Sequence, residues 1–136
     1  MIFSLAILLF SILSCNSSAI GDTPSANAER IIREKILKKS NGYFKVISLQ
    51  KTDAVENGNI YSAYYNVIIG GAKNGGYVVL NSKGNLIHGA SVKEKKDEFY
   101  LFDKRWMSYS RVEKGKQYVI EEKVTILKHE NGWQEL

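Results

Sequence analysis

The sequence of 136 residues contains only one cysteine, one proline and two histidines, and each scarcity excludes a class of structure. A single cysteine excludes an intramolecular disulfide and any zinc or iron–sulfur site that needs several thiolates. The two histidines have no acidic residues at ligand spacing, so we predict no metal site and no cofactor. We interpret His88 and His129 as surface or cross-strand residues rather than as general bases.

Composition and charge place the chain among folded domains. Charged residues make up 24% of the sequence and aromatic residues 11%, and the formal net charge is +5. That aromatic content is too high for a disordered chain, and the length fits one domain. Basic residues gather on the predicted helix face and at Lys93, Lys95, Lys96 and Lys104.

Residues 2–13 form an uncharged apolar run. Twelve helical residues rise about 18 Å, well short of a hydrocarbon core of ~30 Å, so the run fits a secretory signal better than a transmembrane helix. Met1 alone precedes the run, where a signal peptide usually opens with Lys or Arg; an upstream start or an atypical signal would explain this.

The segment Ile12-Leu13-Ser14-Cys15-Asn16 resembles the lipobox of bacterial lipoproteins. The resemblance implies a signal peptide over 1–14, cleavage before Cys15, and a lipid with palmitate-like acyl chains on the sulfur, which together anchor the protein stably in a membrane. Asn16 is not the Asp that retains enterobacterial lipoproteins at the inner membrane, so in a Gram-negative cell the resemblance implies the outer membrane. The alternative is a plain cleaved signal with an incidental Cys15. Residues 15–23 are predicted to be a polar tether.

A helix is predicted at about 24–40. Thr23 supplies an N-cap hydroxyl, and Pro24 stands where its missing N–H is harmless. Asn41-Gly42 is a typical C-terminal stop. One apolar stripe recurs at i, i+4 spacing, formed by Ala28, Ile32 and Ile36.

Alternating apolar and polar residues predict strands after the helix. The expected strands or apolar segments are 44–51, 60–69, 77–81, 86–91, 99–102, 105–112 and 117–129, joined by turns at 53–59, 70–76, 82–85 and 113–116. The glycine-rich segment 70–76 is interpreted as a hairpin turn, because a phosphate loop would lead into a helix. Asn131-Gly132 is expected to close the last strand, leaving Trp133 as a last apolar group.

A helix followed by five to seven antiparallel strands predicts an α+β domain over 24–136, with one N-terminal helix packed on a curved antiparallel sheet. This order resembles the cystatin-like fold, and residues 36–70 carry most of the resemblance. The ending 124–133, an apolar strand, a basic residue and Gly-Trp, is similar to small secreted domains of the nuclear-transport-factor-like group. Such folds host binding, inhibition and catalysis.

Tyrosines and one carboxylate supply the candidate contact residues. Tyr61, Tyr65 and Tyr118 would either line an apolar pocket on the concave face of the sheet or be core packing. Glu122 shares their face, where a carboxylate in a cleft indicates a functional site; the alternative is a strand-end residue paired with Lys or Arg.

Three functions are compatible with these residues. The first is a non-catalytic envelope lipoprotein whose domain binds a small ligand, a peptide or a partner protein, but no nucleic acid. The basic surface would bind anionic lipid or cell-wall polymer; the favoured alternative is a surface that is only solvated. The second is a cysteine-protease inhibitor or propeptide-like domain. Gly75–Asn81 with Gly89-Ala90-Ser91 is similar in sequence to streptopain-like propeptides. Asn66–Gly70 partly resembles the Gln-x-Val-x-Gly motif of the inhibitory hairpin of cystatins. The third is an enzyme that uses Glu122.

Overall fold

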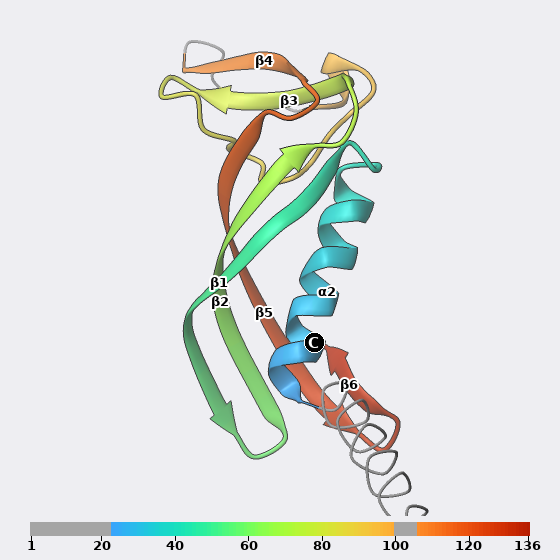
Figure 1. Cartoon of the computed structure of the whole chain (residues 1–136), viewed down its shortest axis with the longest axis vertical. Helices are drawn as coiled ribbons and strands as arrows, with labels where there is room; N and C mark the ends of the chain where they lie inside the picture. Colours follow the sequence, from blue (N-terminus) through green and yellow to red (C-terminus); the bar gives the residue numbers. More distant parts are fainter. Residues whose placement is uncertain (1–22, 100–105) are drawn as a thin grey trace, which may run out of the picture.

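The computed structural model describes residues 23–99 and 106–136 (Figure 1). It confirms the α+β class, with one helix packed on an antiparallel sheet. The strands form two open sheets rather than one, of order β1-β2-β5-β6 and β3-β4. The elements are α2 (Pro24–Lys39), β1 (Phe44–Asn57), β2 (Ile60–Gly71), β3 (Gly75–Asn81), the short 3-10 helix η1 (Lys96–Glu98), β4 (Met107–Val112), β5 (Gln117–His129) and β6 (Gly132–Glu135).

The α2 helix begins and ends as its sequence predicts. The Thr23 hydroxyl accepts a hydrogen bond from the Ala26 N–H at 3.2 Å, which satisfies one of the free donors of the first turn. At the other end Asn41 and Gly42 take positive φ angles of 51° and 76°, which turn the chain out of the helix. The buried stripe consists of Ala28, Ile31, Ile32 and Ile36.

The concave face of the larger sheet packs against this stripe. On β2 the inward side chains alternate with outward ones, and all five inward residues are buried: Tyr61, Ala63, Tyr65, Val67 and Ile69. The inward face of β5 continues the same core, and its bounds are those that the periodicity predicts. The helix therefore closes the concave side of the sheet.

The predicted turn at 53–59 is wrong, because β1 continues to Asn57 and only Gly58 and Asn59 form the turn. Residues 53–57 are exposed on both faces and include the apolar Ala54 and Val55, so they give no alternating pattern of burial. Their backbone is nevertheless paired with β2, and the hydrogen-bond ladder overrides their weak strand preference. Two register shifts in β1, at Ile47 and Thr52, bend this edge strand.

Two further expectations about strands are wrong. Residues 86–91 form no strand and contribute only an isolated bridge between Leu80 and Leu86. After Gly132 the chain does not end its pairing, because β6 folds back on β5 and places Trp133 opposite Lys128. Most of the apolar segment 99–102, and Arg105 before β4, lie outside the described residues.

Segment 70–76 is not a hairpin turn. β2 pairs with β1 and β5, whereas β3 pairs with β4, so the segment carries the chain from one sheet to the other. We call the β3–β4 sheet and its connecting loops, residues 73–99 and 106–116, the second unit. Its Val78, Val92 and Val112 are buried in the same core as α2. The Val92 N–H donates to the carbonyl of Lys39 at 3.2 Å, so the second unit packs over the C-terminal end of the helix (Figure 1).

Gly71 marks the point at which β2 leaves the larger sheet. Its N–H donates to the Lys116 carbonyl at 2.9 Å, and its own carbonyl accepts from the Gly115 N–H at 2.9 Å. A Cβ on Gly71 would meet the backbone carbonyl of Glu113. A Cβ on Gly70 would instead meet side-chain atoms, of which the terminal carbon of Ile47 is the nearest at 2.6 Å. The β4–β5 turn can therefore pack on Gly71 only because the residue has no side chain.

We expect Gly71→Ala to lower the free energy of unfolding by about 1–3 kcal/mol, because the backbone of Glu113 must move to admit a methyl group. Gly70→Ala is the matched control, since the exposed Ile47 side chain can rotate away. Urea unfolding of both variants measures the difference. Equal losses in the two variants would contradict the packing role of Gly71.

Candidate functional site

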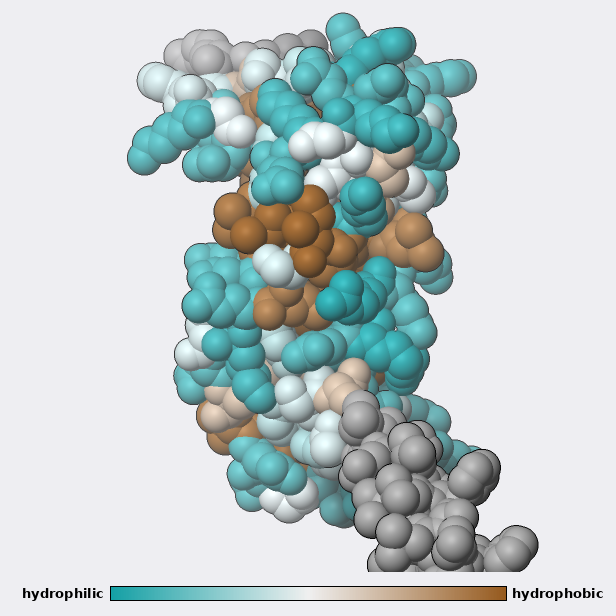
Figure 2. Space-filling model, viewed as in Figure 1, coloured by the Kyte–Doolittle hydropathy of each residue, from teal (hydrophilic) through white to brown (hydrophobic). Residues whose placement is uncertain are grey.

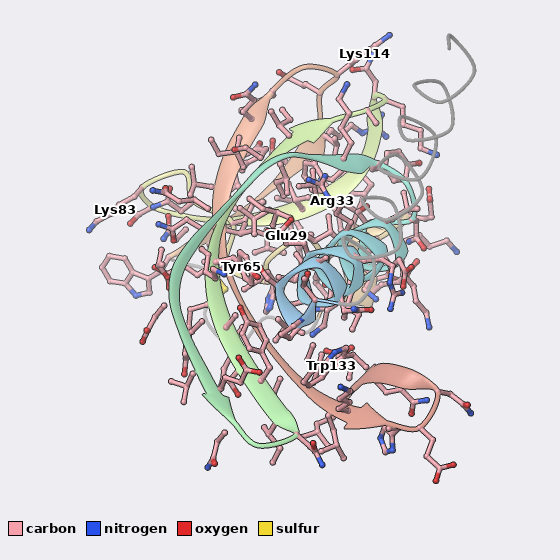
Figure 3. All side chains as sticks on the ribbon, turned by 60° about the horizontal axis from the view of Figure 1, so that its bottom comes forward. Glu29, Arg33, Tyr65, Lys83, Lys114 and Trp133 are labelled. Atoms are coloured by element: carbon pink, nitrogen blue, oxygen red, sulfur yellow. The ribbon has the colours of Figure 1, made fainter. Side chains whose placement is uncertain are left out.

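The three tyrosines named from the sequence are buried in the core of the protein. Tyr61 is 5% exposed, Tyr65 1% and Tyr118 8%. Figure 3 shows Tyr65 on the concave side, between the sheet and the helix. The hydroxyls of Tyr65 and Tyr118 are buried without a well-formed hydrogen bond to any described residue. These side chains are therefore part of the core.

The other candidate residues are spread along the sheet. Glu122 is half-buried in the middle of β5, opposite Tyr65 in the register, and no described Lys or Arg forms an ion pair with it. Asn66 is opposite Glu121, and Gly70 lies farther along β2, opposite Gln117. Of the two histidines, His129 is exposed at the end of β5, on the face opposite the core.

A shallow hollow of about 700 Å³ brings three of the named residues together: Tyr65, Asn66 and Glu122. Its remaining lining is polar and crosses β1, β2 and β5, with Thr52, Asp53, Tyr64, Glu121 and Lys123. The Lys123 ammonium lies 5.3 Å from the centre of the Tyr64 ring. Cysteine, serine and histidine are absent from the lining of this hollow.

A second group of side chains, which the sequence did not indicate, gathers on the outer face of the β3–β4 pair. Tyr77 of β3 is opposite Arg111 of β4, and an isolated bridge places Lys93 on its other side. Tyr109 is opposite Val79, two residues along the same face. We call Tyr77, Lys93, Lys96, Tyr109 and Arg111 the basic-aromatic surface.

Cations and tyrosine rings contact one another across the basic-aromatic surface. One Arg111 nitrogen donates to the Tyr77 hydroxyl at 3.2 Å, and the guanidinium lies 5.1 Å from the centre of that ring. The Lys96 ammonium lies 5.4 Å from the Tyr77 ring centre and 5.8 Å from that of Tyr109. Contacts of this type orient a cation without neutralising it.

Neighbouring side chains support and extend this surface. Phe99 is buried against Tyr109, with ring centres 6.2 Å apart, and His88 stacks on its other side at 5.7 Å. Near the start of β3, the Lys73 ammonium lies 4.3 Å from the ring centre of Tyr43. The Tyr43 hydroxyl donates to a Glu94 carboxylate oxygen at 3.3 Å.

The positive charge of the protein is concentrated in this second unit. Residues 73–99 and 106–116 contain eight Lys and Arg but only four Asp and Glu, whereas the other described residues contain nine and eight. Both ion pairs among the described residues, Arg30–Glu34 and Lys35–Glu135, lie elsewhere. Lys83 and Lys114 point outward in Figure 3, and this end of the molecule is largely hydrophilic in Figure 2.

The phenol groups respond to these charges in opposite directions. The hydrogen bond from Arg111 and its positive charge lower the pKa of Tyr77. Burial, together with the hydrogen bond to Glu94, raises the pKa of Tyr43. The lowered pKa of Tyr77 therefore reflects mainly its hydrogen bond with one cation, Arg111, which favours the charged phenolate.

Comparisons with known proteins supply no relative: no family model, no curated protein and no solved structure matches this chain. The described residues contain no group of three or more His, Cys, Asp and Glu side chains that could hold a metal ion. No helix within the described ranges is long and apolar enough to span a membrane.

We expect Tyr65→Phe to leave stability unchanged or to raise it by up to about 1 kcal/mol, because the hydroxyl that it removes is buried without a good partner. Tyr61→Phe is the matched control. Its hydroxyl accepts a hydrogen bond from the Lys51 ammonium at 3.3 Å, so its loss should lower stability by about 0.5–1.5 kcal/mol. Chemical unfolding that ranks the two variants in the opposite order would contradict this account of the core.

The same substitution has a defined pH dependence. Burial raises the pKa of Tyr65 to about 12 from the ordinary value of 10.0, so folding favours the neutral phenol. Its contribution to stability is therefore fully present below pH 10 and is lost as the pH rises towards 12. Unfolding measured across this range should show a shallower decline in Tyr65→Phe than in the unsubstituted protein.

We expect Arg111→Gln to return the pKa of Tyr77 upward towards 10.0, because Arg111 is the main cause of its lowering. Lys96→Gln should raise it less, since the charge of Lys96 is the weakest contribution. Ultraviolet titration of each variant, with and without Tyr77→Phe, isolates the one phenol. An unchanged Tyr77 titration in Arg111→Gln would contradict the contact.

Proposed function

We propose that the protein is an exported envelope lipoprotein, anchored through a lipid on Cys15, whose domain is a non-catalytic binding module for an anionic partner. The anchor rests on the lipobox resemblance, because Cys15 lies outside the described residues. The binding role rests on the structure. Its support is the basic-aromatic surface, where Lys96 and Arg111 lie on tyrosine rings and form no ion pair with a described carboxylate.

The arrangement of this surface favours binding over a purely structural role. An exposed ion pair contributes about 0–1 kcal/mol and an exposed cation–π contact about 0.5–1 kcal/mol, so either would stabilise the fold to a similar degree. Only the second leaves the positive charge available to an incoming anion. Arg111 also has a planar guanidinium, which suits bidentate contact with a carboxylate or phosphate.

The two alternatives have less support in the structure. Asn66 and Gly70, the residues of the inhibitor hypothesis, lie in β2, which is paired on both sides, so they form no projecting hairpin. Gly75–Asn81, the propeptide-like stretch, is β3 and contributes Val78 and Leu80 to the core. The enzyme hypothesis relies on Glu122, which lines the shallow hollow together with Tyr65 and Asn66 but without a cysteine, serine or histidine.

We expect native protein extracted from membranes in mild detergent to have an intact mass that begins at Cys15 and includes two or three acyl chains. Cys15→Ser should move the protein out of the membrane fraction, because no acyl chain can be attached. Ser14→Ala, which keeps a small residue before the cysteine, is the matched control and should remain anchored. A native chain that starts near Ser18 or Ala19 without lipid would contradict the anchor.

A further inference from the structure

We infer that the basic-aromatic surface binds an anionic polysaccharide, and that it presents this site on the end of the domain directed away from the anchoring membrane. The inference deepens the proposed function. The direction of the site rests on the lipid at Cys15, whereas the binding of the polymer does not.

The form of the surface favours an extended ligand with repeated charges. Lys93, Tyr77 and Arg111 stand side by side across three paired segments, and Lys96 lies over the rings of Tyr77 and Tyr109. Lys73 lies over the ring of Tyr43, whose hydroxyl donates to Glu94. Arg111 and Lys96 are exposed, so a small anion would meet one or two cations in open solvent. A polymer engages several at once and gains from each additional contact.

The aromatic residues favour a polysaccharide over a nucleic acid. Proteins that bind single-stranded nucleic acid offer free aromatic faces on which successive bases stack. Here Arg111 and Lys96 already lie over Tyr77, and Lys96 also lies over Tyr109. The tyrosines therefore hold the cations in place, and the ligand is bound through charge and hydrogen bonds to its acidic groups.

The helix separates the surface from the end at which the described chain begins. The described chain begins at Thr23, at the N-terminal end of α2, whereas the β3–β4 unit packs at Lys39, at the other end (Figure 1). The 16 residues of α2 rise about 24 Å. The Debye length in physiological salt is about 8 Å, so a surface at this distance lies beyond most of the field of anionic headgroups.

The first experiment measures polymer binding without the anchor. The full chain carrying Cys15→Ser, in mild detergent, is titrated with heparin as the probe polysaccharide. We expect binding that weakens steeply with salt and falls at least about tenfold in Lys96→Gln/Arg111→Gln. The matched control, Arg33→Gln/Lys38→Gln, removes the same charge from exposed helix positions and should change the affinity by less than about twofold.

Two outcomes of this experiment would overturn the inference. One is an equal loss of affinity in the control variant, which would show that binding depends only on the net charge of the protein. The other is tighter binding of single-stranded DNA than of heparin at the same salt concentration. Lys93→Gln/Lys96→Gln leaves the hydrogen bond between Arg111 and Tyr77 intact. It provides the same test if the first double variant does not fold.

The second experiment tests the direction of the site. The lipidated protein is placed in vesicles of phosphatidylcholine, with or without phosphatidylglycerol, and its affinity for heparin is compared. We expect less than about a twofold difference, because the site lies outside the screened field of the membrane. A loss of tenfold or more with phosphatidylglycerol would show that the surface lies on the membrane instead. Failure to find lipid on Cys15 would remove the anchor but leave the heparin result in solution unaffected.

Discussion

The contact between the apolar stripe of α2 and the concave face of β2 and β5 is the constraint on which the rest of the structure depends. Ile32 and Ile36 are buried on the helix side, and Tyr65 and Ile126 on the sheet side. The alternate apolar side chains of β2 and β5 point to the concave face of the larger sheet. The helix covers this face, so these side chains become core. Any binding chemistry must then use the convex face, the loops or the second unit.

The second unit exists because the helix does not cover the whole core. Beyond Lys39 the chain turns back through Ser40, whose hydroxyl accepts a hydrogen bond from the Phe44 N–H at 3.2 Å and thereby fixes the start of β1. Val78 and Val92 cover the core past this end of the helix. β3 therefore buries Val78 and Leu80 in the core, and Tyr77 and Arg111 remain at the surface.

Sequence periodicity predicted the elements that have one buried and one exposed face. α2, β2 and β5 are of this kind, and their type and position are confirmed to within two residues. The second half of β1 is exposed on both faces, and β6 has only four residues, so neither produces a period that a sequence can show. Their pairing comes from the neighbouring strand, which is a tertiary effect.

The basic-aromatic surface could not be predicted from the sequence, because it too depends on which strands pair. Lys93 and Lys96 were visible only as part of a general surplus, and Tyr77, Tyr109 and Arg111 as members of separate strands. These residues lie on one surface only because β3 pairs with β4. The sequence instead favoured a single sheet with a hairpin at 70–76. Tyr61, Tyr65 and Tyr118 were named because they lie on the apolar face of β2 and β5. That face is buried in the core, so the same pattern that singled them out also predicts their burial.

The distribution of charge is the strongest sign that the exposed end has a role beyond stability. A domain selected only for stability gains by interspersing both signs, since like charges repel and isolated ion pairs contribute little. Here the excess is gathered at one end, and tyrosines rather than carboxylates hold Lys96 and Arg111. Because a tyrosine orders a cation without cancelling its charge, the fold keeps a positive surface in a defined shape, and that combination is useful only to an anionic partner.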